Sequence, residues 1–298
     1  MKNRSCEGPQ ADKASVATRG LWSDAYRRFR RSPSAITGFV MILAMVVLAI
    51  IAPWITPYDP VDQNLTEALL PPSRQHLFGT DQFGRDILTR VMYGTRISLW
   101  VGFVSVSIAS AVGIPLGLSA GYYMGWVNIV IDRLTDILLA FPSVLLAMSI
   151  MTMLGPNLTN AMIAVGISIA PQYIRLARGS TLSTKQKEYV LAVKAAGGAT
   201  FRILMRHILP NILSPLIVLT SLEVGAAVLF ASGLSFLGLG ARPPTPEWGA
   251  MLTEARVYLR QAWWIPVFPG LAITYLILAT NLLGDGLRDA LDPQAIIQ

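Results

Sequence analysis

The stretch AITGFVMILAMVVLAIIAPWIT, from Ala35 to Thr56, is a continuous apolar run without a charged side chain. A helix needs roughly 20 such residues to cross about 30 Å of hydrocarbon, because each residue adds about 1.5 Å. A cleavable signal sequence has a shorter apolar core of about 7–15 residues and a small-residue cleavage site, which is lacking here. The run therefore predicts a retained membrane-spanning helix.

Five more apolar segments follow along the chain. They are Ile97 to Gly121, Leu134 to Leu154, Leu158 to Ile174, Ile212 to Gly240 and Ala262 to Gly284. Lipid offers no hydrogen-bond partner to a bare backbone amide, so each segment is expected to be helical. The segment with Asp136 near one end and the short segment with Pro171 fit this pattern least well. The sequence predicts an all-α membrane protein with about six transmembrane helices.

The overall composition supports a membrane protein. Of the 298 residues, 53% are hydrophobic and only 14% are charged, whereas a soluble domain is usually about a quarter charged. The net charge of +7 could suggest nucleic acid, but the Lys and Arg gather between apolar runs and lack an aromatic-studded face. We expect the lipid bilayer, and no nucleic acid, as a partner. The single cysteine, Cys6, excludes a disulfide framework within the chain.

The basic residues also predict an orientation. With the N-terminus inside, 17 of the 24 Lys and Arg fall on the cytoplasmic side, which is the side that retains them. Trp54 and Trp100 then lie at outer ends of segments, where indole rings prefer the headgroup layer. Both termini are therefore predicted to be cytoplasmic.

The segments divide the chain into four parts. A basic cytoplasmic tail, 1–34, precedes the first helix and an external loop, 35–95. A membrane domain of five helices, 96–287, contains an inner loop at 178–211. A short cytoplasmic tail, 288–298, ends the sequence.

No phosphate-binding loop or zinc-binding helix motif is found. The sequence has no G-x-x-x-x-G-K-S/T or H-E-x-x-H, and His76 and His207 are its two histidines. Asp132 and Asp136, four residues apart, could be the carboxylates of an intramembrane aspartyl enzyme. The simpler interpretation is that acids favour the N-terminus of a helix. We expect no catalytic residue, metal or cofactor in this chain, so any ATP must be hydrolysed by a partner.

Two features inside the predicted helices have alternative interpretations. Glu223 is the acid expected well inside the membrane, where an ionisable group usually faces a cavity or a partner. It could contact a cationic substrate or couple to a proton, or it could simply be paired or reach the interface. Gly113, Gly117 and Gly121 form two G-x-x-x-G steps, which predict close helix packing rather than substrate contact.

The inner loop reads RGSTLSTKQKEYVLAVKAAGGATFRILMRHILPN from Arg178 to Asn211. A short helix is predicted over 187–196, ended by two glycines, and a second helix begins near Thr200 and enters the membrane through Pro210. Such an elbow at the cytoplasmic face could be a docking handle, or only a solvated amphipathic loop.

This loop resembles the coupling motif of ABC importer permeases, the EAA loop. Gly197 matches the glycine of that motif, and the sequence ILPN at 208–211 matches its close. The E-A-A positions fall on Leu191, Ala192 and Val193, so the acid and the second alanine are missing.

Other stretches resemble the dipeptide, oligopeptide and nickel permease family, specifically its C-type subunit. They are HLFGTDQFGRDILTRVMYGTRISL from His76, SFLGLGARPPTPEWGAML from Ser235 and NLLGDGLRDALDP ending at Pro293. The likeness extends over nearly the whole chain from Ala35 onward.

The resemblance implies a type I ABC importer permease. Its expected partners are a second, different permease, two ATP-binding subunits and an external solute-binding protein. The residues that it implies for ATPase coupling are Tyr189, Leu191, Ala192, Val193, Gly197, Gly198, Arg206, His207, Pro210 and Asn211. The expected cargo is di- or oligopeptides, with glutathione, nickel or another small solute as alternatives. A channel or a structural membrane protein remains the rival class.

Overall fold

The computed structural model describes residues 27–291. Cys6, most of the predicted basic tail and the final residues 292–298 lie outside this range. The described chain is helical, with no strand and an isolated bridge between Thr80 and Asp86. The predicted all-α class is confirmed.

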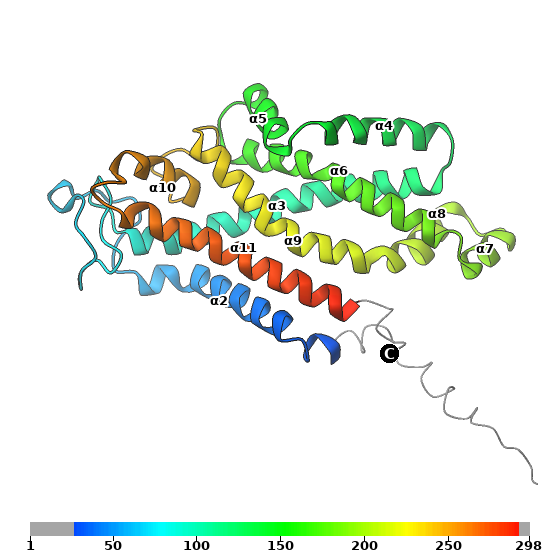
Figure 1. Ribbon diagram of the computed structural model, residues 1–298, viewed down its shortest axis with the longest axis horizontal. Helices are drawn as coiled ribbons and strands as arrows, with labels where there is room; N and C mark the ends of the chain where they lie inside the picture. Colours follow the sequence, from blue (N-terminus) through cyan, green and yellow to red (C-terminus); the bar gives the residue numbers. More distant parts are fainter. Residues whose placement is uncertain (1–26, 292–298) are drawn as a thin grey trace, which may run out of the picture.

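Apart from α5, the longer helices lie roughly along one common axis (Figure 1). Their bounds are α2 Pro33–Ile55, α3 Ile87–Tyr122, α4 Trp126–Ala140, α5 Ser143–Leu154, α6 Leu158–Thr184, α9 Leu209–Phe236 and α11 Trp264–Leu291. The shorter helices are α7 Glu188–Ala195, α8 Thr200–Arg202 and α10 Trp248–Ala255, with 3₁₀ turns at Leu65–Glu67 and Arg256–Tyr258 and a π-helical turn, η2, at Ile203–Ile208.

Four helical segments in the described range are long and apolar enough to span a membrane: α2, α3, α11 and the continuous stretch from Thr200 to Phe236. The pair α4 and α5 would make a fifth span. The remaining predicted segment, Leu158 to Ile174, lies in α6, which has 27 residues and runs beside α3. This helix is less apolar because it continues past Ile174, through Arg175 and Arg178, to Thr184.

One predicted helix is wrong in detail. The segment Leu134 to Leu154 is not a single straight helix, because α4 and α5 meet at an angle of 96°. Pro142 lies at the break. A proline has no N–H to donate and disfavours the helical conformation of the residue before it, here Phe141.

The glycine stripe of α3 packs against α6, as predicted. A Cβ placed on Gly117 would lie 2.6 Å from the Cβ of Ala177, and one placed on Gly121 would lie 2.6 Å from the Cβ of Thr181. Gly113 meets Tyr173 in the same way. Because these distances are shorter than van der Waals contact, the glycines allow the two helices to approach closely.

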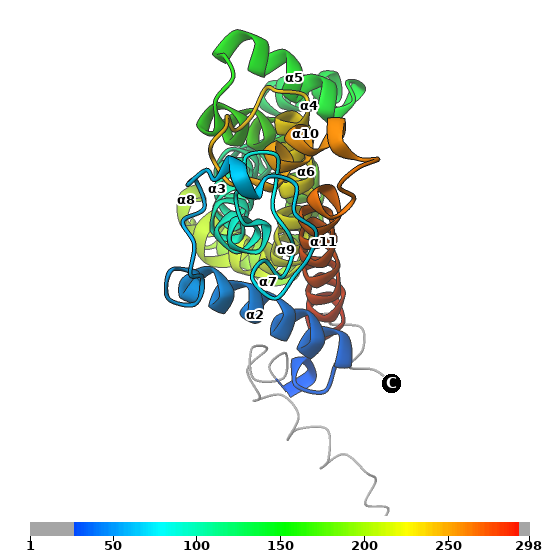
Figure 2. The ribbon, with the colours of Figure 1, turned by 90° about the vertical axis from the view of Figure 1, so that its left-hand side faces the viewer.

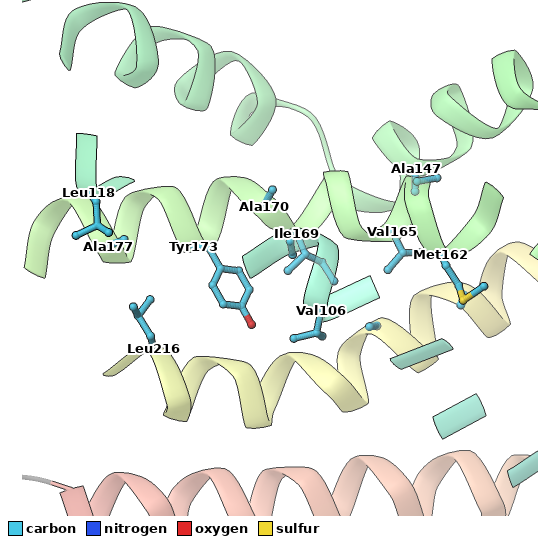
Figure 3. Packing of buried hydrophobic residues seen from close by; sticks show 14 of the residues in the cluster. Val106, Leu118, Ala147, Met162, Val165, Ile169, Ala170, Tyr173, Ala177 and Leu216 are labelled. Carbon is cyan, nitrogen blue, oxygen red and sulfur yellow. The ribbon is translucent and has the colours of Figure 1, made fainter. Parts of the chain in front are cut away.

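The main apolar core lies between α3, α5, α6 and α9, as Figure 3 shows for part of it. Tyr173 is fully buried there, and its hydroxyl lies 3.1 Å from Oγ1 of Thr220 on α9. Helix α2 and the α4–α5 pair lie on opposite sides of this core (Figure 2).

The bundle has two distinct ends (Figure 1). The α10 end carries the loop 56–86 and α10. The α7 end carries α7 and α8, together with the start of α2 and the end of α11. The start of α2 and the end of α11 therefore lie at the same end of the bundle as the elbow, which is the arrangement that the sequence predicts.

Candidate functional site

The elbow at the α7 end is built from α7, Gly197 and α8. Glu188 in the first turn of α7 and Lys194 in its last turn suit the helix dipole. The helix ends at Gly197, whose φ of +78° is a conformation that favours glycine. The amide of Gly198 donates to the carbonyl of Val193 at 3.0 Å, which closes the last turn.

Some apolar side chains of the elbow are buried and others are exposed. Val190, Ile203 and Ile208 are buried, and they fix the elbow to the bundle. In contrast, the side chains of Leu191 and Phe201 are 51% and 73% exposed. Exposed apolar side chains of this kind are typical of a protein contact surface.

The predicted coupling residues differ in how far they are exposed. Tyr189, Leu191, Ala192, Gly197, Arg206, Pro210 and Asn211 are exposed, whereas Val193, Gly198 and His207 are half-buried. Sequence reasoning missed Phe201 and Met205, which are also exposed. Phe201 and Ile208 are seven residues apart and would share one face of a regular α-helix, so no local signal separated the exposed side chain from the buried one.

The elbow joins α9 through the π-helical turn η2. The amide of Leu209 donates to the carbonyl of Leu204, five residues earlier, and the next residue, Pro210, has no N–H to donate. The side-chain amide of Asn211 donates to the carbonyl of His207 at 2.7 Å. Wide turns of this kind are frequent at functional sites.

A cavity of about 790 Å³ opens between α4, α6 and α9, a volume in the range of small-molecule sites. Its polar lining is Gln172, Arg175, Ser180, Ser183, Thr184 and Asn211, and its apolar lining includes Leu139, Leu176, Ile212, Pro215 and Leu219. Arg175 makes no ion pair with any described residue. The cavity thus reaches the end of the predicted inner loop, because Asn211, the last residue of that loop, is part of its lining.

Asp132 and Asp136 do not form a joint site. Asp132 lies 3.2 Å from Nη2 of Arg178, whose Nε donates to Asn128 at 2.7 Å. Asp136 is exposed. Asp132, which is next to Arg133 in the sequence, therefore pairs with Arg178 and connects α4 to α6.

Glu223 is in the middle of α9 and only 8% exposed. Its Oε2 atom has no hydrogen-bond partner among the described residues. Leu219, one turn earlier, lines the cavity, whereas Glu223 does not. The role of Glu223 in a pathway stays a prediction.

The α10 end holds a buried network of charges. Nε of Arg85 lies 2.6 Å from Asp81, and its Nη2 lies 2.7 Å from Glu254. Arg90 approaches the same two acids at 3.6 and 3.4 Å. Both arginine side chains are 1% exposed, so the two cations and two anions satisfy one another away from water.

A second group of contacts fixes the loop 56–86 to the start of α3. Nδ1 of His76 lies 3.0 Å from Asp86, and the ring of His76 stacks on Tyr58. Asp86 caps α3 by accepting a hydrogen bond from the amide of Thr89 at 2.8 Å. The conspicuous motif that begins at His76 thus folds the loop onto the bundle.

Glu247 caps α10 at this end. Its carboxylate accepts hydrogen bonds from the amides of Gly249 and Ala250 at 2.9 and 2.8 Å, and from Ser232 at 3.2 Å. Burial raises the pKa of Glu247, and these hydrogen bonds oppose the rise.

Known proteins match both parts of the chain. Residues 113–297 match the family of binding-protein-dependent transport system inner membrane components. Residues 20–72 match the N-terminal transmembrane domain of oligopeptide transport permease C.

Curated relatives are similar over nearly the whole length. The dipeptide transport system permease protein DppC of Alkalihalophilus pseudofirmus is 46% identical, over 92% of this chain and 90% of that protein. The di/tripeptide transport system permease protein DppC of Pseudomonas aeruginosa is 44% identical, over 96% of both chains. The glutathione transport system permease protein GsiD of Escherichia coli is 47% identical, over 92% of this chain and 90% of that protein.

Among solved structures, the inward-facing MetNI methionine ABC transporter shares the fold. The TM-score is 0.59 at 16% identity, over 69% of this chain and 98% of the matched chain. Fold and helical pattern together define a multi-pass inner-membrane protein with the type I ABC importer permease fold.

The chain belongs to the family of binding-protein-dependent transport system inner membrane components, as a C-type permease of the dipeptide and oligopeptide group. Membership implies that ATPase and solute-binding subunits are its partners.

Proposed function

We propose that this chain carries di- or oligopeptides across the inner membrane as one permease of an ATP-driven importer. An external solute-binding protein delivers the peptide, and two separate ATP-binding subunits drive transport. The dipeptide and di/tripeptide permeases, 46% and 44% identical, support this cargo. Glutathione, itself a peptide, is the second candidate because a glutathione permease is 47% identical.

The elbow is the proposed docking site for an ATPase subunit. The observation that carries this proposal is the exposure of three large apolar side chains, Tyr189, Leu191 and Phe201, on a segment that buried residues hold in place. A displacement of α7 would pass through η2 into α9, because α7 packs against η2 and η2 continues directly into α9. Packed helices of this kind switch between discrete arrangements.

Leu191 changes the chemistry of this contact. It stands where the coupling motif of the family has its acid, and its side chain is about half exposed. An ion pair from this position is impossible, so we infer that the ATPase groove meets it with apolar side chains. Lys187 precedes this helix and Lys194 lies in its last turn, both exposed, and they favour an acidic rim on the partner.

The α4–α5 pair is the proposed contact with the second permease. Trp126 and Met153 are 81% and 88% exposed, and Leu145 is also exposed. The cavity beside α4 then lies next to this contact, where it would line the solute pathway, with Glu223 as a candidate residue deeper in α9. In this arrangement the α7 end faces the cytoplasm and the α10 end faces the binding protein.

The docking proposal is tested by Gly197→Pro in the assembled transporter. The φ of +78° at Gly197 is not accessible to proline, so the elbow should lose its shape while the bundle remains. We expect the variant to insert in the membrane but to lose co-purification of the ATPase. Gly155→Pro is the matched control, since Gly155 has a φ of +85° in the α5–α6 turn. Normal ATPase recovery with Gly197→Pro would refute the docking site.

The cargo is tested separately, on the solute-binding protein that works with this permease. We expect that protein to bind di- and oligopeptides, and the reconstituted transporter to take up the same peptides with ATP. Binding of glutathione or nickel in place of peptides would move the assignment to that solute. Uptake of no tested solute despite intact ATPase docking would contradict the cargo alone.

A further inference from the structure

A groove of about 640 Å³ runs between α2 and α3. Helix α2 lies on the side of the bundle away from α4 and α5 (Figure 2), so the groove is remote from the cavity described above. Its lining is Val46, Ala49, Ile50, Pro53 and Trp54 from α2, and Arg96, Leu99, Trp100 and Phe103 from α3. Arg96 is the single charged residue among them.

The two ends of the groove differ in chemistry. Helices α2 and α3 run in opposite directions (Figure 1), so Trp54 and Arg96 share one end while Val46 and Phe103 share the other. Val46 and Trp54 are eight residues apart in a helix, which corresponds to about 12 Å. Trp54 is 78% exposed and Trp100 is also exposed, as indole rings are at the headgroup layer of a bilayer. The groove thus passes from an aromatic, cationic end to a purely apolar end.

Arg96 lacks a partner within the described part of the protein. It is exposed and makes no hydrogen bond or ion pair with a described residue. Arg90, less than two turns earlier on the same helix, is 1% exposed and paired with Asp81 and Glu254. Arg96 is also the last charged residue of α3 before a long uncharged stretch. A cation in this position is available to an anion from outside the chain.

We propose that this groove binds an anionic phospholipid. The phosphate contacts the guanidinium of Arg96, and the glycerol region lies between Trp54 and Trp100. One acyl chain follows the apolar floor toward Val46 and Phe103. Along a phospholipid, a phosphate is followed by the interfacial glycerol region and then by an apolar chain. Along the groove, the cation is followed by the indoles and then by apolar side chains. The bound lipid would join α2 to α3, and this role does not depend on the transported solute.

Tryptophan quenching tests the site, because two of its residues are fluorescent. The assembled transporter is reconstituted with phosphatidylglycerol or phosphatidylcholine that carries bromine on the acyl chain. Quenching at the groove is measured as the difference in fluorescence quenching between the wild-type protein and the double variant Trp54→Phe, Trp100→Phe. We expect brominated phosphatidylglycerol to be preferred by about fivefold, the ratio for one cationic side chain beside an anionic headgroup.

Variants of Arg96 decide what causes the preference. Arg96→Gln should abolish it, and Arg96→Lys should keep it because the positive charge remains. Arg133→Gln is the matched control: Arg133 is exposed on α4 and is not part of the groove, so the preference should persist. Equal quenching by both lipids in the wild-type protein would overturn the proposal. Absence of groove quenching by either lipid, as expected if a protein helix covers the site, would also overturn it.

Discussion

The two ends of the bundle differ in how their charged side chains are held. At the α10 end, Arg85 and Arg90 are buried against Asp81 and Glu254. At the α7 end, by contrast, Lys187, Lys194 and Arg206 are exposed, and so is the apolar Leu191. The buried charges are satisfied within the chain, whereas we propose that the α7 end meets a partner. The difference separates residues that hold the fold from residues that we propose transmit force.

The largest expected effect is on the α10 end. Arg85→Ala removes one cation from a buried network and leaves two acids facing Arg90 alone. Loss of one member of a buried ion pair typically costs about 3–5 kcal/mol. We expect a decrease of this order in the free energy of unfolding, measured by denaturant titration in mixed micelles.

The control is Arg256→Ala at the same end, where the side chain is exposed and the change should cost less than about 0.5 kcal/mol. Equal effects of the two substitutions would mean that the buried network does not stabilise the protein.

A smaller effect is expected between the ends, where α3 meets α6. Gly117→Leu places side-chain atoms where the Cβ of Ala177 already lies 2.6 Å from the Cβ position of residue 117. Overpacking of this kind costs about 1–3 kcal/mol. Gly233→Leu is the control, since no atom lies within 4 Å of its Cβ position. The same titration checks both, and an unchanged stability of Gly117→Leu would contradict the close α3–α6 contact.

The smallest effect concerns pH at the α10 end. Burial raises the pKa of Glu247 in the folded protein above its unfolded value. The stability contributed by protonation of this carboxyl is therefore fully present below the unfolded pKa, about 4.3, and is lost as pH rises through the folded pKa.

Glu247→Gln should flatten this part of the profile, although it also removes one acceptor of the α10 cap. Thermal midpoints measured from acid to neutral pH check the difference between the two proteins. Parallel profiles would show that Glu247 does not titrate in this window.

Local patterns in the sequence predicted the helices and the glycine stripe. Gly113, Gly117 and Gly121 recur every four residues and so must share one helix face. The break at Pro142 was missed, because the apolar run continues through it. The network at Arg85 was also missed, because its partner Glu254 is 169 positions away in the chain. A local pattern contains no information on such a pairing.

The elbow was also predicted from a local pattern, and that pattern did not indicate which of its side chains are exposed. Two adjacent glycines after a short amphipathic run mark the end of a helix, and Gly197 indeed has a positive φ. Which apolar side chains are exposed there depends on how η2 and α9 pack against the core. Phe201 was therefore not anticipated, although it is 73% exposed.

The most direct test of the central claim is the protection of one introduced thiol by the ATPase. Cys6 is the natural cysteine, so Leu191→Cys and Val257→Cys are each made in a Cys6→Ser background. Both positions are exposed, at opposite ends of the bundle. A membrane-impermeant maleimide is applied from either side of vesicles, with the ATPase subunits present or stripped.

We expect Leu191→Cys to react only from the cytoplasmic side and to be protected by the ATPase. Val257→Cys should react only from the opposite side, with or without the ATPase. Equal labelling of Leu191→Cys in the presence and absence of the ATPase would contradict the assignment of the elbow as the docking site.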